Sequence, residues 1–110
     1  MQPSIPSVKV DQVPPGVFLL DVREPEEWAA GHAPDAHHLP MQEVPARMAE
    51  VPMDGDVFVV CRMGGRSARV VEFLQANGWD NVINLDGGMR AWAAAGRPMV
   101  GENGTPAEVI

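Results

Sequence analysis

The chain has 110 residues, of which 45% are hydrophobic and 21% charged, a composition typical of one globular domain. A formal charge of −7 and a pI near 4.7 argue against a nucleic-acid partner. One cysteine excludes an internal disulfide and a zinc site built on paired cysteines. We see no secretory signal and no apolar run that could span a bilayer, so we expect a cytoplasmic protein without a membrane partner.

The first half of the chain predicts short elements separated by proline and glycine. Residues 1–12 predict an N-terminal arm with at most one edge strand, because prolines interrupt them. The apolar run Phe18 to Leu20 predicts a strand covered on both faces. A helix is expected from Pro25 to Gly31, since proline suits a first helical position and glutamates surround it. Two shorter elements follow, a strand at 37–39 and a helix at 42–50.

The second half carries the strongest patterns. Val57 to Val60 predicts a buried strand. A helix is expected over 67–77, with Ser67 as its N-cap and Gly78 as its stop. Its inward stripe would contain Val70, Phe73 and Leu74, and two tryptophans on helix faces, Trp28 and Trp92, are expected in the core. A strand at 82–85, a last helix after Gly88 and a surface tail over 101–110 complete the chain.

Strands that alternate with helices predict an α/β fold. We expect a three-layer sandwich with a mainly parallel central sheet flanked by helices. In such sheets, ligands bind beyond the carboxyl ends of the strands. The loop after Val60 lies at such an end.

That loop holds the lone cysteine and reads Cys61-Arg62-Met63-Gly64-Gly65-Arg66-Ser67. Helix N-terminal N–H groups and nearby guanidinium groups both lower the pKa of a thiol. The two glycines allow positive φ, so several N–H groups can turn inward as an anion cradle. No acidic residue occurs from Val57 to Val71, although the chain is acidic overall. We therefore expect a catalytic thiolate that handles an anionic substrate, rather than a structural cysteine in an ordinary turn.

This loop resembles the active-site loop of rhodanese-type sulfurtransferases. The segment from Leu20 to Trp28, followed by Gly31-His32, is similar to the amino-terminal motif of that family. The segment from Leu85 to Trp92 is similar to its carboxyl-terminal motif. The resemblance implies a single rhodanese domain over 13–100, between the arm and the tail, with a rhodanese-like sandwich fold.

The resemblance also implies a reaction and roles for residues. Cys61 would take the outer sulfur from an anionic donor such as thiosulfate, become a persulfide, and pass the sulfur to cyanide, a thiol or a protein acceptor. The substrate-binding residues would be the rest of the loop, Arg62, Met63, Gly64, Gly65, Arg66 and Ser67. The side chain of Met63 either lines the mouth of the pocket or points to solvent. No cofactor is implied.

Four further residues are assigned supporting roles. Asp21 and Arg23 are expected to form a structural ion pair or a loop anchor, and His32 and Asp86 belong to the two outer motifs. His32, His37 and His38 are close in sequence, but adjacent side chains of an extended segment point to opposite faces. We therefore expect no metal site.

Three other functions use similar residues. A cysteine phosphatase or arsenate reductase builds its cradle on Cys-x5-Arg, whereas four residues separate Cys61 from Arg66 here. A second alternative is a sensing or docking module. Rhodanese-like domains with such roles often lack the cysteine, whereas this chain retains Cys61 with Arg62 and Arg66. A persulfide carrier that serves one protein partner would keep all the same residues.

Overall fold

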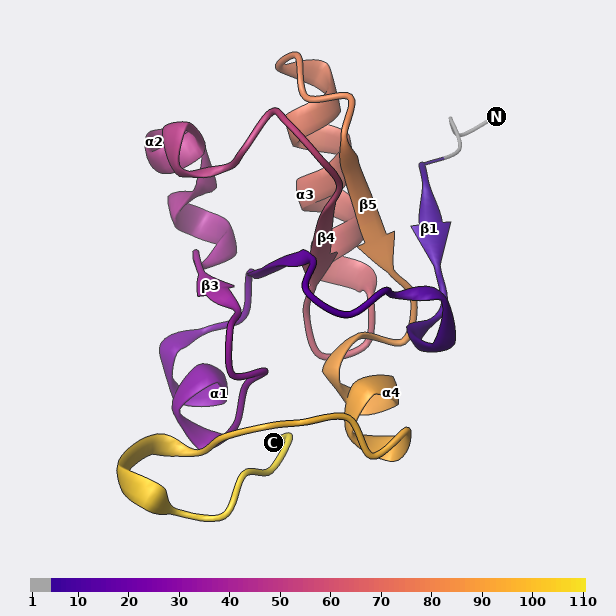
Figure 1. The fold of residues 1–110 in the computed structure, drawn as a ribbon. Coiled ribbons are helices and arrows are strands. Elements are labelled where there is room, and N and C mark those ends of the chain that lie inside the picture. Colours follow the sequence, from indigo (N-terminus) through magenta and orange to yellow (C-terminus); the bar gives the residue numbers. More distant parts are fainter. Residues whose placement is uncertain (1–4) are drawn as a thin grey trace.

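The structure, a computed structural model, describes residues 5–110. In this range one sheet has the strand order β1-β5-β4-β2-β3, and every pairing is parallel. Figure 1 shows the sheet with its helices. The strands are β1 (Ser7–Val8), β2 (Phe18–Asp21), β3 (His37–His38), β4 (Val57–Val60) and β5 (Val82–Leu85). The helices are α1 (Pro25–Ala30), α2 (Val44–Arg47), α3 (Gly65–Ala76) and α4 (Gly88–Ala94), with short 3-10 turns between them.

Alternate residues of the central strands enter two separate cores, as expected of a sheet covered on both faces. Val57 and Val59 pack with residues of α2 and α3, whereas Phe58 and Val60 pack with Met89 and other residues on the α4 side. The predicted three-layer α/β sandwich is therefore confirmed. None of the helices in residues 5–110 has the length and hydrophobicity needed to cross a bilayer.

Most predicted elements are present. The strands expected at 18–20, 57–60 and 82–85 are β2, β4 and β5, and the helix expected from Pro25 ends before Gly31 as predicted. The segments at 37–39 and 42–50 form β3 and the short α2 with its flanking 3-10 turns.

Both ends of the described segment, residues 5–110, contact the sandwich. Part of the predicted arm, residues 1–4, lies outside the described residues, but Ser7–Val8 forms the edge strand β1 beside β5. In the tail, Figure 1 shows the yellow segment running from the α4 side to α1 and turning back. There the backbone N–H of Glu108 donates to the Ala30 carbonyl at 2.9 Å. The domain boundaries at 13 and 100 stay predictions.

Two details of α3 were predicted wrongly. The helix begins at Gly65 and its N-cap is Gly64, with φ 116°, so Ser67 lies inside the first turn and is fully buried. The chain must turn sharply after Cys61, and glycine takes this left-handed conformation without steric cost. Phe73 is 36% exposed, because the buried stripe is Ser67, Val70, Val71 and Leu74, at the helical spacing i, i+3, i+4 and i+7.

The expectation for the tryptophans holds for one of them. Trp92 is buried in the core on the α4 side. Trp28 is only half-buried and belongs to neither core. Its ring stacks on His32, with centroids 3.6 Å apart, and on His38, at 4.6 Å. Trp28 therefore packs on His32, which follows α1, and on His38 of β3 rather than in either core.

A buried ion pair lies at the carboxyl end of β2. Arg23 Nη2 lies 2.7 Å from Asp21 Oδ2, and both side chains are 0% exposed. The same guanidinium donates to the carbonyl oxygens of Glu27, at 3.3 Å, and Gly31, at 2.8 Å. The pair therefore attaches α1 to the carboxyl end of β2.

We predict that Asp21→Asn strongly destabilises the fold, because it leaves the Arg23 guanidinium buried without a counter-charge. Removing one partner of a buried pair costs about 3–5 kcal/mol of unfolding free energy. Urea denaturation measures this loss. Glu43→Gln, which removes one partner of the exposed Arg47, is the control and should leave the midpoint unchanged. Equal midpoints for wild type and Asp21→Asn would contradict the assigned role.

The two loop glycines should respond differently to alanine. Gly64→Ala forces a side chain into the left-handed region and should cost about 1–2 kcal/mol of stability. Gly65 has no positive φ, and no atom lies within 4 Å of an added Cβ. Gly65→Ala should therefore keep or raise the midpoint of thermal unfolding. A larger loss for Gly65→Ala than for Gly64→Ala would contradict this assignment.

Candidate active site

Cys61 directly follows β4, where the connections of the sheet change direction. The chain leaves β2 toward β3 on one side and leaves β4 toward β5 on the other. Ligands of open α/β sheets bind at such a switch point, beyond the carboxyl ends of the strands. The cysteine is 1% exposed, so its sulfur lies at the bottom of the loop that follows it.

The loop surrounds the sulfur with hydrogen-bond donors. The backbone N–H of Gly64 donates to Cys61 Sγ at 3.0 Å, and Ser67 Oγ lies 3.3 Å from the sulfur. The carbonyl groups of the loop point elsewhere, because Cys61 O accepts from the N–H of Met89 at 2.8 Å and Arg62 O accepts from the next N–H along α4. The loop can therefore direct N–H groups inward.

Gly88 makes this arrangement possible. Its φ is +55°, and a Cβ there would lie 2.3 Å from Cys61 O. Any side chain at this position would push the loop away from α4. Gly88, the first residue of α4, thus holds the cysteine loop in place by close backbone contact.

These contacts set the charge state of the thiol. Burial raises the pKa of Cys61. Hydrogen bonds from the Ser67 side chain and from the backbone N–H groups of Ser67, Gly64 and Met63 together lower this pKa by more than burial raises it. The resulting pKa is below the usual value of a thiol. The site therefore favours the thiolate, which is the nucleophilic form of cysteine.

Ser67 is itself held from β5. Its hydroxyl donates to Asn84 Oδ1 at 2.6 Å, and Asn84 is only 5% exposed. With this donor used, the Cys61 thiol can donate to Ser67 Oγ, and loss of the thiol proton lets the hydroxyl turn toward the sulfur. Ser67 thus contacts the sulfur from inside the first turn of α3.

The two loop arginines have different partners. Arg66 Nη1 and Nη2 donate to the two carboxylate oxygens of Glu27, at 2.6 Å and 2.9 Å. Arg62 Nε donates to the Ile110 carbonyl at 2.9 Å. Met63, between them in sequence, is 54% exposed. Both guanidinium groups thus lie on the loop that holds Cys61, and one of them is paired with a carboxylate.

The remaining predicted support residues lie around the site rather than in it. Asp21 and Arg23 form the buried pair described above. His32 Nδ1 lies 2.8 Å from the Trp28 carbonyl, and its backbone pairs with Val100. The side chain of Asp86 is exposed, and its backbone N–H donates to Val8 O at 2.8 Å.

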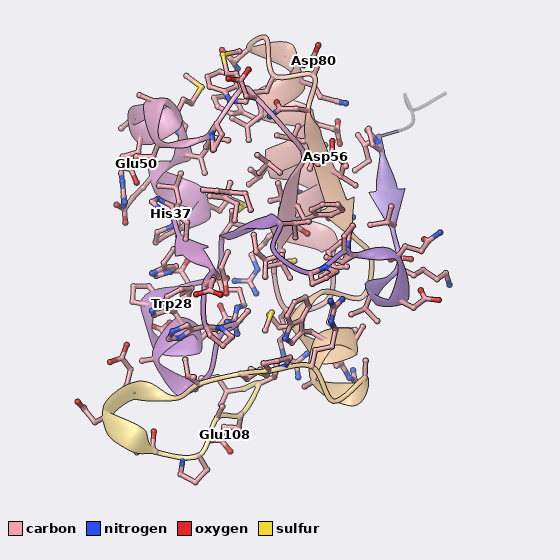
Figure 2. The ribbon with its side chains drawn as sticks, viewed as in Figure 1. Trp28, His37, Glu50, Asp56, Asp80 and Glu108 are labelled. Atoms are coloured by element: carbon pink, nitrogen blue, oxygen red, sulfur yellow. The ribbon has the colours of Figure 1, made fainter. Side chains whose placement is uncertain are left out.

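The other two histidines contact different partners. His37 Nε2 lies 2.7 Å from Glu50 Oε1, a pair visible on one side of Figure 2. His38 Nε2 lies 2.8 Å from the Arg23 carbonyl oxygen.

Sequence reasoning missed two residues of the site. Asn84 carried a usable signal, because a polar residue in an otherwise apolar buried strand needs a hydrogen-bond partner. Glu27 was interpreted only as a helix-start charge. Its contact with Arg66 joins residues 39 positions apart, and no local pattern indicates such a pair.

Comparisons with known proteins identify the family of the chain. The model of the rhodanese-like domain family matches residues 8–95. A sulfurtransferase of Allochromatium vinosum is 47% identical over 88 residues, which are 80% of this chain and 82% of that protein.

Solved structures share the fold. A rhodanese-like domain protein of Staphylococcus aureus superposes with a TM-score of 0.73 at 34% identity, over 94% of this chain and 99% of that one. A thiosulfate sulfurtransferase of Pseudomonas aeruginosa gives a TM-score of 0.75 at 26% identity, over 96% of this chain and 22% of that one. With the family model matching most of its length, this chain belongs to the rhodanese-like domain family, and its sulfurtransferase relatives support a transferase activity.

Proposed function

We propose that the protein transfers a sulfane sulfur from an anionic donor such as thiosulfate to a thiophilic acceptor, through a persulfide on Cys61. The observation that carries the proposal is a buried cysteine whose pKa is lowered by hydrogen bonds from its own loop. The name of the Pseudomonas aeruginosa neighbour, a thiosulfate sulfurtransferase, supports thiosulfate as the first donor to test.

In the first half-reaction, the Cys61 thiolate attacks the outer sulfur of thiosulfate. A new S–S bond forms at Cys61, the S–S bond of thiosulfate breaks, and sulfite leaves with the bonding electron pair. The protein then carries a persulfide anion, which needs no proton from the site. The Gly64 N–H and the Ser67 hydroxyl lie near the attacking sulfur and can stabilise negative charge there.

In the second half-reaction, a nucleophile removes the outer sulfur. With cyanide, the carbon attacks that sulfur, thiocyanate leaves, and the Cys61 thiolate returns. The described loop has one thiol, and no second cysteine exists in the chain to resolve the persulfide. An external acceptor is therefore required. The free thiol also suits a reducing compartment, so the cytoplasm stays the expected location.

The test is the intact mass after thiosulfate treatment, followed by cyanide. We expect a gain of one sulfur atom and its loss on addition of cyanide, with release of thiocyanate. Cys61→Ser removes the only thiol and should show no gain. A wild-type protein that gains no sulfur from thiosulfate would contradict thiosulfate as donor. A gain that cyanide cannot remove would favour a carrier that discharges to a protein.

Ser67→Ala tests how the nucleophile is activated. The variant removes the side-chain hydrogen bond that lowers the pKa of Cys61, so that pKa should rise. The thiolate forms above the pKa, so the rate of alkylation by iodoacetamide should fall at neutral pH and its pH profile should shift to higher pH. An unshifted profile would show that Ser67 does not act on the sulfur.

A further inference from the structure

We infer that Glu27 sets the charge selectivity of the sulfur-donor site, by neutralising the Arg66 guanidinium on the cysteine loop. This inference rests on the proposed function and assigns a positioning residue for it. Glu27 comes from α1, whereas the loop follows β4.

The contact has the geometry of a strong pair. Both Nη atoms of Arg66 donate to separate oxygens of the Glu27 carboxylate, at 2.6 Å and 2.9 Å. The Glu27 side chain is 13% exposed and that of Arg66 is 30% exposed. A two-point pair of this kind fixes both the position and the orientation of the guanidinium. Arg66 is thus directed toward a carboxylate of the protein itself.

A second set of contacts fixes the carboxylate. Glu27 Oε1 also accepts the backbone N–H of Glu24 at 3.0 Å, within the first turn of α1. The Glu27 carbonyl accepts from Arg23, a member of the buried ion pair. The hydrogen bond from Arg66 lowers the pKa of Glu27 against the opposite effect of burial, so the carboxylate is charged at neutral pH.

The pair changes the charge that a donor meets. The Glu27 carboxylate opposes the charge of the Arg66 guanidinium, so a donor that approaches Cys61 meets less positive charge than the loop arginines alone would supply. A less positive site discriminates less in favour of a dianion over a monoanion. Glu27 therefore lets the loop accept singly charged sulfur donors alongside thiosulfate.

Glu27→Gln is the variant that tests this role. Glutamine keeps the length of the side chain and an oxygen that can accept from the Glu24 N–H, so the cap of α1 can persist. One unit charge roughly 6 Å away in a water-like medium changes the affinity of a monoanion by about threefold and of a dianion by about tenfold. Glu26→Gln is the matched control, because it removes the same charge from the exposed neighbouring residue.

The first readout needs no sulfur transfer. Cys61 is the only thiol, so its alkylation by iodoacetate, an anion, can be compared with alkylation by neutral iodoacetamide. The ratio of the iodoacetate rate to the iodoacetamide rate does not depend on the thiolate fraction of Cys61, because both reagents react with the same thiolate. We expect Glu27→Gln to raise this ratio about threefold. Glu26→Gln should leave it unchanged, and Glu27→Asp, which keeps the charge, should stay near wild type.

The second readout compares two donors that transfer the same sulfur. Thiosulfate is a dianion that releases sulfite, and methanethiosulfonate is a monoanion that releases methanesulfinate. For Glu27→Gln we expect the KM to fall about tenfold for thiosulfate and about threefold for methanethiosulfonate. Altered folding alone would not sort the two donors by charge.

The two readouts separate the inference from the proposed function. An unchanged alkylation ratio in Glu27→Gln, or an equal rise in Glu26→Gln, overturns the role of Glu27 even if wild type is loaded by thiosulfate. A raised ratio in Glu27→Gln with no sulfur gained from thiosulfate leaves the role of Glu27 supported and removes thiosulfate as donor.

Discussion

The buried ion pair of Asp21 and Arg23 is the contact on which the geometry of the site depends. Two charges without solvent exposure are stable only when both are paired and their remaining hydrogen-bonding atoms have partners. Arg23 meets this condition by donating to carbonyl groups of Glu27 and Gly31. The direction of α1 follows from these bonds. So does the position of the Glu27 side chain, which reaches across to Arg66 on the cysteine loop.

The loop is held from its other side by backbone alone. N–H groups at the start of α4 bond the carbonyls of Cys61 and Arg62, which requires the absence of a side chain at Gly88. With the carbonyls held, the N–H of Gly64 points at the sulfur. The site thus lies between a charged support on α1 and a hydrogen-bonded support on α4. The α4 support fixes the N–H donors around the thiolate, and the α1 support fixes the position of the Arg66 guanidinium.

The sequence predicted the sheet and the nucleophile for physical reasons that act locally. The run from Val57 to Val60 predicts a buried strand, and a lone cysteine between that strand and paired glycines predicts an anion cradle. The cap of α3 was assigned to Ser67 because serine is a common N-cap, but the sharp turn after Cys61 selected Gly64. Ser67 was then free to contact the sulfur.

Contacts between distant segments could not be predicted in the same way. The absence of acidic residues from Val57 to Val71 indicated a positive loop, yet the partner of Arg66 comes from α1. A count of charged residues along one segment omits the residues that the fold places beside it from other segments. The tail gave a similar result, since its low apolar content did not indicate that Glu108 bonds to α1 or that Ile110 reaches Arg62.

The depth of Cys61 also bears on oxidation. A disulfide between two copies would bring two sulfurs to about 2.05 Å and their Cβ atoms to about 4 Å. A residue that is 1% exposed at the bottom of its loop cannot approach a second copy that closely without opening both loops. The fold therefore protects its single thiol from covalent dimerisation.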